Sequence, residues 1–264
     1  MSFYELPAET RGYYFFESRN SEDTRPHFHR AIEFLFVKAG KQEIVLDGEK
    51  RVLSVGDGCF IDSFHVHSLP ADPDAVSYAI LGDRAYFEDF FTNRPGYTLP
   101  RFFTFSDFYL LDSLYDLCKR PYKEEDKRLL FSGIARMLTA MIAASAPPVV
   151  QKENKQESLI CDILRYTQDN LGADLSLAAL STRYGYSREH LSRMLHRYIN
   201  ENWNEYVNRL RVGKASWLLK ENGNKNVLEI LLECGFNSPN TFYRAYKKEF
   251  SQSPRRNIGE HVNI

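Results

Sequence analysis

The feature that most constrains the fold of this 264-residue chain is an internal repeat near its C-terminus. Residues 177–199 and 227–250 share one arrangement: a short segment with apolar residues at helical spacing, a glycine, and a longer amphipathic segment. The aligned pairs are Leu180 with Ile230, Gly185 with Gly235, Leu191 with Phe242, and Arg193 with Arg244. Because two helices joined by a tight turn that contains glycine form a helix-turn-helix, we predict two such units within residues 158–264.

The segment between the two repeats predicts a rigid connector. Residues 202–221 have a helical pattern, and at a rise of about 1.5 Å per residue they span roughly 30 Å. That length approaches the separation of about 34 Å between successive major grooves on one face of DNA. The distribution of formal charge also favours a DNA partner for the C-terminal half, because residues 157–264 carry a net charge of +3 whereas residues 1–156 carry −4. We therefore expect an all-α C-terminal domain whose partner is double-stranded DNA.

Three strings in residues 159–258 resemble the AraC-type DNA-binding domain. Residues 191–195 match L-S-R-x-L, residues 206–219 match Y-x-x-R-L-R-x-x-K-A-x-x-L-L, and residues 235–248 match G-F-x-x-x-x-x-F-x-R-x-[FY]-K-K. The resemblance implies a bacterial-type transcription regulator that responds to a ligand and is not an enzyme. If it activates transcription, RNA polymerase would be a further partner.

The chain departs from the family pattern at the ends of both predicted reading helices. Asn200 and Ser251 replace the glycine that usually follows each helix, so both would have to adopt the left-handed conformation, which Asn tolerates better than Ser. Leu231 stands where a small residue is usual, and Asn257 and Ile258 replace the usual Tyr-Arg. Ser176 and Ser187 are predicted N-caps, because their hydroxyls can accept from free backbone N–H groups.

The candidate DNA contacts lie on the helices that begin near Ser187 and Ser238. They are Ser187, Arg188, His190, Ser192, Arg193 and His196 in the first unit, and Asn237, Ser238, Asn240, Thr241, Tyr243, Arg244 and Lys247 in the second. Two alternatives remain open. The first group could be only a solvated helix face, and the two arginines could each pair with a carboxylate and brace their unit. The densest basic cluster, where we expect phosphate contacts, comprises Lys247, Lys248, Arg255 and Arg256.

The N-terminal half has the pattern of a β domain. Short apolar runs between residues 13 and 80 are broken by glycines. Asp47-Gly48 between two such runs predicts a hairpin in which both turn residues have positive φ. The spacing His27-x-His29-x₃-Glu33-x₆-Gly40, followed by Gly56-Asp57 and His67, is similar to the two motifs of the cupin superfamily, a small double-sheet β-barrel. We therefore predict a multidomain α and β chain with a cupin-like barrel over residues 1–105.

The cupin resemblance singles out His27, His29, Glu33 and His67. In cupins that bind metal, the matching positions supply three histidines and one glutamate, a set that suits Zn, Fe, Ni or Mn. Read without the family, residues 27 and 29 would share one face of a strand, and Glu33 could join them after a short turn. AraC-type sensor barrels resemble metal cupins yet commonly bind an organic effector, often a sugar, without metal. The four residues could thus line an effector pocket that requires no cofactor, hold a divalent metal, or be structural. A metal-dependent cupin enzyme, a dioxygenase or isomerase, is the alternative function.

Residues 106–146 predict a helical hairpin, and residues 147–157 a polar linker. The second helix carries an apolar stripe that exceeds what one neighbouring helix needs to cover, so we expect this hairpin to form a homodimer. The stripe comprises Leu129, Leu130, Ile134, Met137, Leu138, Met141 and Ile142.

Several classes of protein are disfavoured by the sequence. No run of eighteen apolar residues and no secretory signal pattern occurs, so we expect a cytoplasmic protein without a membrane partner. The four cysteines are far apart, which fits neither a zinc motif nor a disulfide framework. An RNA-binding or scaffolding role is disfavoured, because neither RNP aromatics nor a GXXG loop is present.

Overall fold

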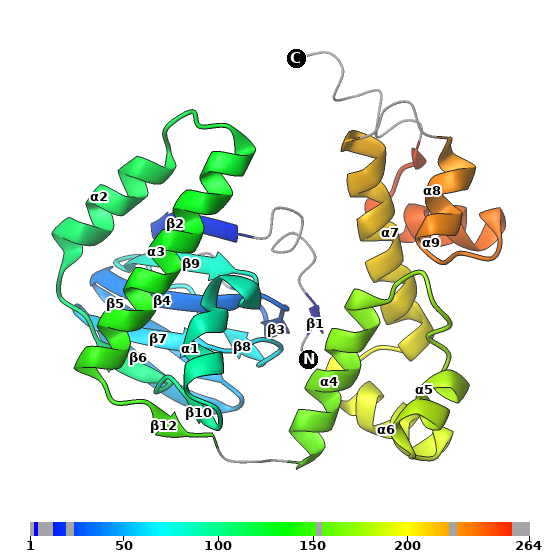
Figure 1. Cartoon of the computed structure of the whole chain (residues 1–264), viewed down its shortest axis with the longest axis horizontal. Coiled ribbons are helices and arrows are strands. Elements are labelled where there is room, and N and C mark those ends of the chain that lie inside the picture. The colour runs from blue at the N-terminus through cyan, green and yellow to red at the C-terminus, as the bar shows by residue number, and fades with distance from the viewer. Residues whose placement is uncertain (1–2, 5–12, 20–23, 152–154, 222–225, 255–264) are drawn as a thin grey trace. The chain divides into compact units, whose positions relative to one another are not determined.

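A computed structural model describes the chain at residues 3–4, 13–19, 24–151, 155–221 and 226–254 (Figure 1). The chain forms two compact units, residues 1–154 and 155–264. The boundary lies inside the predicted linker. Within that linker, β12 (Val149–Val150) pairs with β10 (Tyr97–Thr98), and a helix begins at Lys155.

The N-terminal unit contains two five-stranded sheets, which confirms the double-sheet, cupin-like prediction. The first sheet has the order β1 (Phe3–Tyr4), β3 (His27–Phe28), β8 (His67–Ser68), β5 (Lys41–Leu46) and β6 (Glu49–Ser54). The second has the order β11 (Phe102–Thr104), β7 (Asp57–Ile61), β4 (Ile32–Ala39), β9 (Val76–Gly82) and β2 (Tyr13–Arg19). Neighbouring strands are antiparallel except for β1 and β3.

Strand β4 is apolar almost throughout because both of its faces are covered. Leu35 and Val37 pack with residues of β5, β6 and β7 in the barrel interior. Phe34 and Phe36, on the opposite face, pack with the helices that lie on the outside of this sheet. Side chains alternate along a strand, so Glu33 shares the interior face with Leu35 and Val37. An ionisable residue is thereby placed inside the barrel, where it is 4% exposed.

The predicted hairpin turn is confirmed. Asp47 and Gly48 have φ values of +50° and +84° and connect β5 to β6, with Leu46 paired to Glu49. The Asp47 carboxylate accepts a hydrogen bond from Val66 N at 3.1 Å, and Asp47 N donates to Val66 O at 2.8 Å. The turn is thus fixed against the segment that leads into β8.

Helices cover the outer face of the second sheet. Besides the predicted hairpin of α2 (Phe108–Cys118) and α3 (Glu124–Ser145), a short turn η2 (Arg84–Phe87) and α1 (Glu88–Asn93) follow β9. Helix α3 is long and apolar enough to cross a membrane. It buries Phe131, Ile134, Leu138 and Ile142 against the barrel, as the core helix of a globular unit does. Residues Leu129 and Met137 are exposed, so the predicted single stripe divides into a barrel face and an open face.

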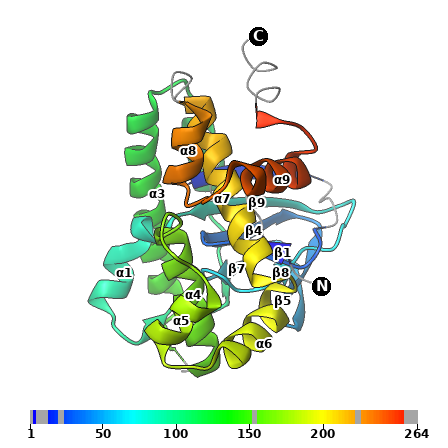
Figure 2. The ribbon, with the colours of Figure 1, turned by 90° about the vertical axis from the view of Figure 1, so that its right-hand side faces the viewer.

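The C-terminal unit is helical, and Figure 2 shows its long helix α7 running between α6 and the pair α8 and α9. Its helices are α4 (Lys155–Asp169), α5 (Leu177–Tyr184), α6 (Arg188–Ile199), α7 (Trp203–Glu221), α8 (Val227–Glu233) and α9 (Pro239–Phe250). Ser176 and Ser187 accept from the backbone N–H groups of Ala179 and His190, which confirms both N-caps.

The repeat is built around equivalent buried positions. Leu180, Ile230, Leu191 and Phe242 are all fully buried, and Leu231 is accommodated in the same core. The residues that replace the two glycines do adopt the left-handed conformation, with φ of +56° at Asn200 and +57° at Ser251. Residues Arg255, Arg256, Asn257 and Ile258 lie outside the described residues.

Candidate functional site

Helix α6 presents a polar face to solvent while its other face is anchored in the core. Leu191, Met194, Leu195 and Ile199 are buried at helical spacing. The candidate contacts on the other face are exposed, except for a half-buried Ser192; they are Ser187, Arg188, His190, Arg193 and His196. Because α6 follows a glycine turn and is capped at Ser187, its first residues stand free for a DNA groove.

His196 differs from the rest of this group. Its Nδ1 lies 3.0 Å from the carbonyl oxygen of Glu201, just beyond the end of α6. An imidazole N–H there donates to a backbone carbonyl that follows the helix, so the structure gives His196 a role in fixing the exit of the chain. This role is neither the base contact predicted for His196 nor the solvated helix face that was its alternative.

Tyr186 is a residue that sequence reasoning missed. Its ring stacks on His190, with 5.3 Å between ring centroids and 17° between ring planes. The turn that carries it is fixed, because Ser181 Oγ donates to Tyr186 O at 2.6 Å. The signal in the sequence was the i, i+4 spacing of two rings across the first turn of a helix.

Helix α9 repeats this arrangement. Phe242 and Tyr246 are buried, whereas Asn237, Asn240, Tyr243, Arg244 and Lys247 are exposed and Ser238 and Thr241 are half-buried. Among the residues described, neither Arg193 nor Arg244 forms an ion pair. The positive charge of Arg193 contributes to lowering the pKa of Glu189, four residues earlier on the exposed face of α6, so this interaction does not brace the unit's core. Lys248 pairs with Glu205 at 2.8 Å, which leaves Lys247 as the better phosphate candidate of the two.

The connector α7 holds both reading helices. It is 19 residues long, about 28 Å at the usual helical rise. Ala215, Leu218 and Leu219 pack with Ile230, Phe236, Phe242 and Tyr246 of the second unit in one buried cluster. The connector is therefore a rigid part of the fold and not a tether.

The barrel site brings together all four candidates from the cupin-like motifs. His27 of β3 and His67 of β8 are direct neighbours across the first sheet, and Glu33 comes from β4 of the second. His29 lies outside any strand, so the expectation that residues 27 and 29 share one strand face was wrong. A bend at residues 30 and 31 brings it to Glu33 instead, and all four side chains are buried. The ring nitrogens of the three histidines lie within 4.8 Å of one another.

Backbone carbonyls fix the tautomers of the three histidines. Nδ1 lies 2.8 Å from Arg25 O in His27, 2.9 Å from Ala31 O in His29 and 3.0 Å from His65 O in His67. A carbonyl oxygen can only accept, so each Nδ1 carries a proton. In a neutral imidazole of this tautomer, Nε2 is the nitrogen that can bind a metal or accept a hydrogen bond.

Two of these Nε2 atoms face the same carboxylate oxygen. Glu33 Oε2 lies 3.1 Å from His29 Nε2 and 3.3 Å from His67 Nε2. Burial alone would raise the pKa of Glu33, but the contacts with His29 and His67 lower it below its usual range, so the carboxylate is charged. A buried carboxylate beside two imidazoles is compensated by a cation, either a proton on the imidazoles or a bound metal ion.

The remaining question is whether that cation is a proton or a metal. Among the described residues, His67 Nε2 has no hydrogen-bond partner although it is buried. Burial, aided by His67, lowers the pKa of His27 to about 4, so His27 stays neutral at pH 7. Three histidines, each fixed through Nδ1 by a carbonyl, and one carboxylate form a donor set that fits a divalent cation such as Zn²⁺.

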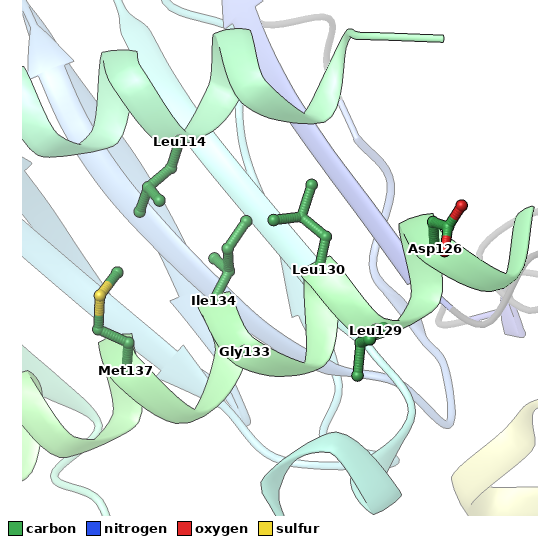
Figure 3. A pocket seen from close by; sticks show the side chains of 7 residues that line it. All are labelled: Leu114, Asp126, Leu129, Leu130, Gly133, Ile134 and Met137. Atoms are coloured by element: carbon green, nitrogen blue, oxygen red, sulfur yellow. The ribbon is translucent and has the colours of Figure 1, made fainter. Parts of the chain in front are cut away.

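A third feature is an apolar groove between α2 and α3, with a volume of about 390 Å³ (Figure 3). Leu114 of α2 faces Leu130 and Ile134 of α3, while Leu129, 76% exposed, and Met137 stand beside them. It lies on the hairpin from which we predicted a dimer contact.

Comparisons with known proteins agree with this division of the chain. A family described as "Helix-turn-helix domain" matches residues 180–257, and one described as "Cupin domain" matches residues 15–78. Among solved structures, wild-type ToxT from Vibrio cholerae bound to an unsaturated fatty acid aligns with 96% of each chain, at 11% identity and a TM-score of 0.49.

Two of the curated relatives are each similar to part of this chain. The transcriptional regulator Rob of Salmonella typhimurium is 34% identical over 99 residues, which are 38% of this chain and 34% of Rob, so only about a third of Rob is covered. The multiple antibiotic resistance protein MarA of Salmonella typhimurium is 31% identical over 107 residues, which are 40% of this chain and 84% of MarA. Since MarA is 31% identical over 84% of its length, and a helix-turn-helix family matches residues 180–257, the chain belongs to the AraC family.

Proposed function

We propose that this protein is a cytoplasmic transcription regulator that binds double-stranded DNA with both helix-turn-helix units and senses a small molecule in its barrel. The observation that carries the proposal is the repeat itself. Two equivalent helices, each with a buried apolar face and an exposed polar face, are held on one rigid connector. A connector about 28 Å long suits two readers in successive major grooves better than two readers in one groove. If the regulator activates transcription, RNA polymerase is a further partner.

Footprinting on DNA selected from a random pool tests the proposal. We expect each protomer to protect two successive major grooves on one face of the duplex, because each unit presents its own reading face. Affinity should exceed that for random DNA by about 10³-fold or more at physiological salt. Protection of a single groove per protomer would show that one unit only supports the other, and equal affinity for both DNAs would refute sequence-specific binding.

For the barrel, we propose that His27, His29, Glu33 and His67 form the sensor site. His27 and His67 come from the first sheet, Glu33 comes from the second, and His29 lies between β3 and β4. All four are buried, so a ligand bound there would contact both sheets of the barrel. The convergence of three imidazoles and one carboxylate supports a divalent cation as part of that site, to which an organic effector could add oxygen ligands. The regulators among the relatives support a sensor rather than a cupin dioxygenase or isomerase.

We also propose a homodimer formed through the open face of α3. Leu129 and Met137 are exposed beside the groove, and an apolar patch of this kind is typical of a protein contact. Light scattering at high micromolar concentration should give the mass of a dimer for the wild type. Met137→Glu should give a monomer, because it places a charge in the contact while leaving the barrel face of the helix intact.

The matched control is Arg136→Glu, which changes an exposed neighbour on α3 that pairs with Asp89 at 3.0 Å on α1. It should leave the dimer unchanged. A wild-type monomer with and without DNA would refute the dimer, and a Met137→Glu dimer would move the contact to another surface.

A further inference from the structure

The second helix-turn-helix unit touches the loop that precedes the first unit, through the turn before α9. Gly235 follows α8 with φ of +87°, and a Cβ atom at this position would lie 2.3 Å from Leu171 O and 2.8 Å from Arg211 Nη2. Both distances are far below van der Waals contact, so any side chain at residue 235 would push the two segments apart. A Cβ at Gly172, on the same loop, would lie 3.2 Å from Glu233 O. Backbone therefore packs on backbone where this turn meets the loop.

Arg211 of the connector closes this contact. Its Nε donates to Leu171 O at 2.8 Å and its Nη2 donates to Ala173 O at 2.7 Å, so one guanidinium bridges two carbonyls of the loop. The planar fork of arginine can make two such bonds at once, which the single ammonium of lysine cannot do in the same geometry. Trp203 Nε1 donates to Leu175 O at 2.7 Å and fixes the far end of the same loop.

The contact lies between the reading helices in the fold but not on either of them. Arg211 and Gly235 belong to the connector and the second turn, and Leu171 precedes the first unit. None of the three belongs to the exposed faces of α6 and α9. A change at this contact would therefore alter the angle and distance between the readers without removing a DNA contact.

We propose that the contact of Leu171, Arg211 and Gly235, the Arg211 joint, sets the number of base pairs that the protein accepts between its two half-sites. The inference rests on the proposed reading of two grooves. Inserting one base pair rotates the second half-site by about 34° and moves it by about 3.4 Å, so a rigid pair of readers must discriminate against it. A protein with a loosened joint can follow the displaced half-site and loses that discrimination. Arg211 and Gly235 are thus positioning residues for DNA recognition.

The test measures binding of the full chain to the selected DNA with one or two base pairs inserted or deleted between the half-sites, and to DNA with the first half-site alone. The wild type should prefer one spacing by about tenfold or more. In Arg211→Lys and Gly235→Ala, this preference should fall to within about twofold, while affinity for the single half-site stays within about twofold of the wild type. Arg165→Ala removes an exposed arginine that pairs with Asp162 on α4, and it should keep the wild-type spacing profile.

Each outcome decides between defined possibilities. Unchanged spacing profiles in both variants overturn the proposal that the Arg211 joint sets the spacing. An equal loss of affinity for every DNA, including the single half-site, also overturns it, because these residues would then be purely structural. Arg211→Lys retains the charge and much of the side chain, so it serves if Gly235→Ala does not fold. A wild type that has no spacing preference and protects one groove contradicts the proposed function instead.

Discussion

Replacing Arg193 and Arg244 together by alanine should reduce affinity for the selected DNA on the order of 10²- to 10⁴-fold. A base-reading arginine contributes about 1–3 kcal/mol, and the two residues lie on separate helices without a shared partner, so their effects should add. Both side chains are exposed and form no ion pair among the described residues, so the free energy of unfolding should change little. Fluorescence anisotropy with selected and random DNA measures both the affinity and the loss of sequence preference.

Lys247→Ala provides the control for charge. Lys247 is exposed on the same helix as Arg244, and we expect it to contact phosphate. Its loss should weaken selected and random DNA alike and lower the slope of log K against log salt by about one. If the double arginine variant behaved in this way, with a slope lowered by about two and an unchanged preference, the arginines would be phosphate contacts. A large fall in Tm would instead show that they brace their units.

A divalent cation should stabilise the wild-type protein after treatment with a chelator, and Glu33→Gln should abolish the effect. At 100 times its Kd, a ligand that binds only the folded state adds about 2.7 kcal/mol, or about 5–10 °C in Tm for a unit of this size. Gln keeps the shape of Glu33 but removes the charge that faces two Nε2 atoms. Thermal unfolding with Zn²⁺, Mn²⁺, Ni²⁺ and Fe²⁺ in turn measures the shift, and His67→Ala should abolish it as well.

The matched control is Glu43→Gln, on β5 of the same barrel, where the carboxylate pairs with Lys50 at the surface. This variant should keep the full thermal shift. Glu33→Gln and His67→Ala should each change DNA affinity in the absence of ligand by no more than about twofold, because no residue of the DNA-reading faces is altered. No shift with any of the four metals would refute the cation and leave the polar pocket for an organic effector. An equal shift in wild type and Glu33→Gln would place the metal elsewhere.

Much of the C-terminal unit could be predicted from the sequence because its determinants are local. The N-caps at Ser176 and Ser187 and the left-handed residues at Asn200 and Ser251 each act within one or two turns of a helix. The same holds for the hairpin at Asp47 and Gly48, where the turn residues themselves require positive φ. Periodicity separated buried Leu191 and Phe242 from exposed Arg193 and Arg244 for the same reason.

The barrel shows the limit of that reasoning. Sequence resemblance selected His27, His29, Glu33 and His67, and these four residues do lie together. The backbone conformation that brings them together differs from the expected one, because His29 lies outside the strand and a bend at residues 30 and 31 places it beside Glu33. The protonated Nδ1 atoms depend on the carbonyls of Arg25, Ala31 and His65, and a backbone carbonyl carries no signature in the sequence.

The sequence by itself determined the two reading helices, their connector and the identity of the barrel residues, because helix period, capping and turn chemistry are written in neighbouring residues. Only the tertiary structure decided which contacts fix these parts. Leu171 and Arg211 are 40 positions apart, and Arg211 and Gly235 are 24 positions apart. Arg211 and Gly235 both approach the backbone carbonyl oxygen of Leu171. Such contacts follow from how whole elements pack, so no local sequence pattern predicts them.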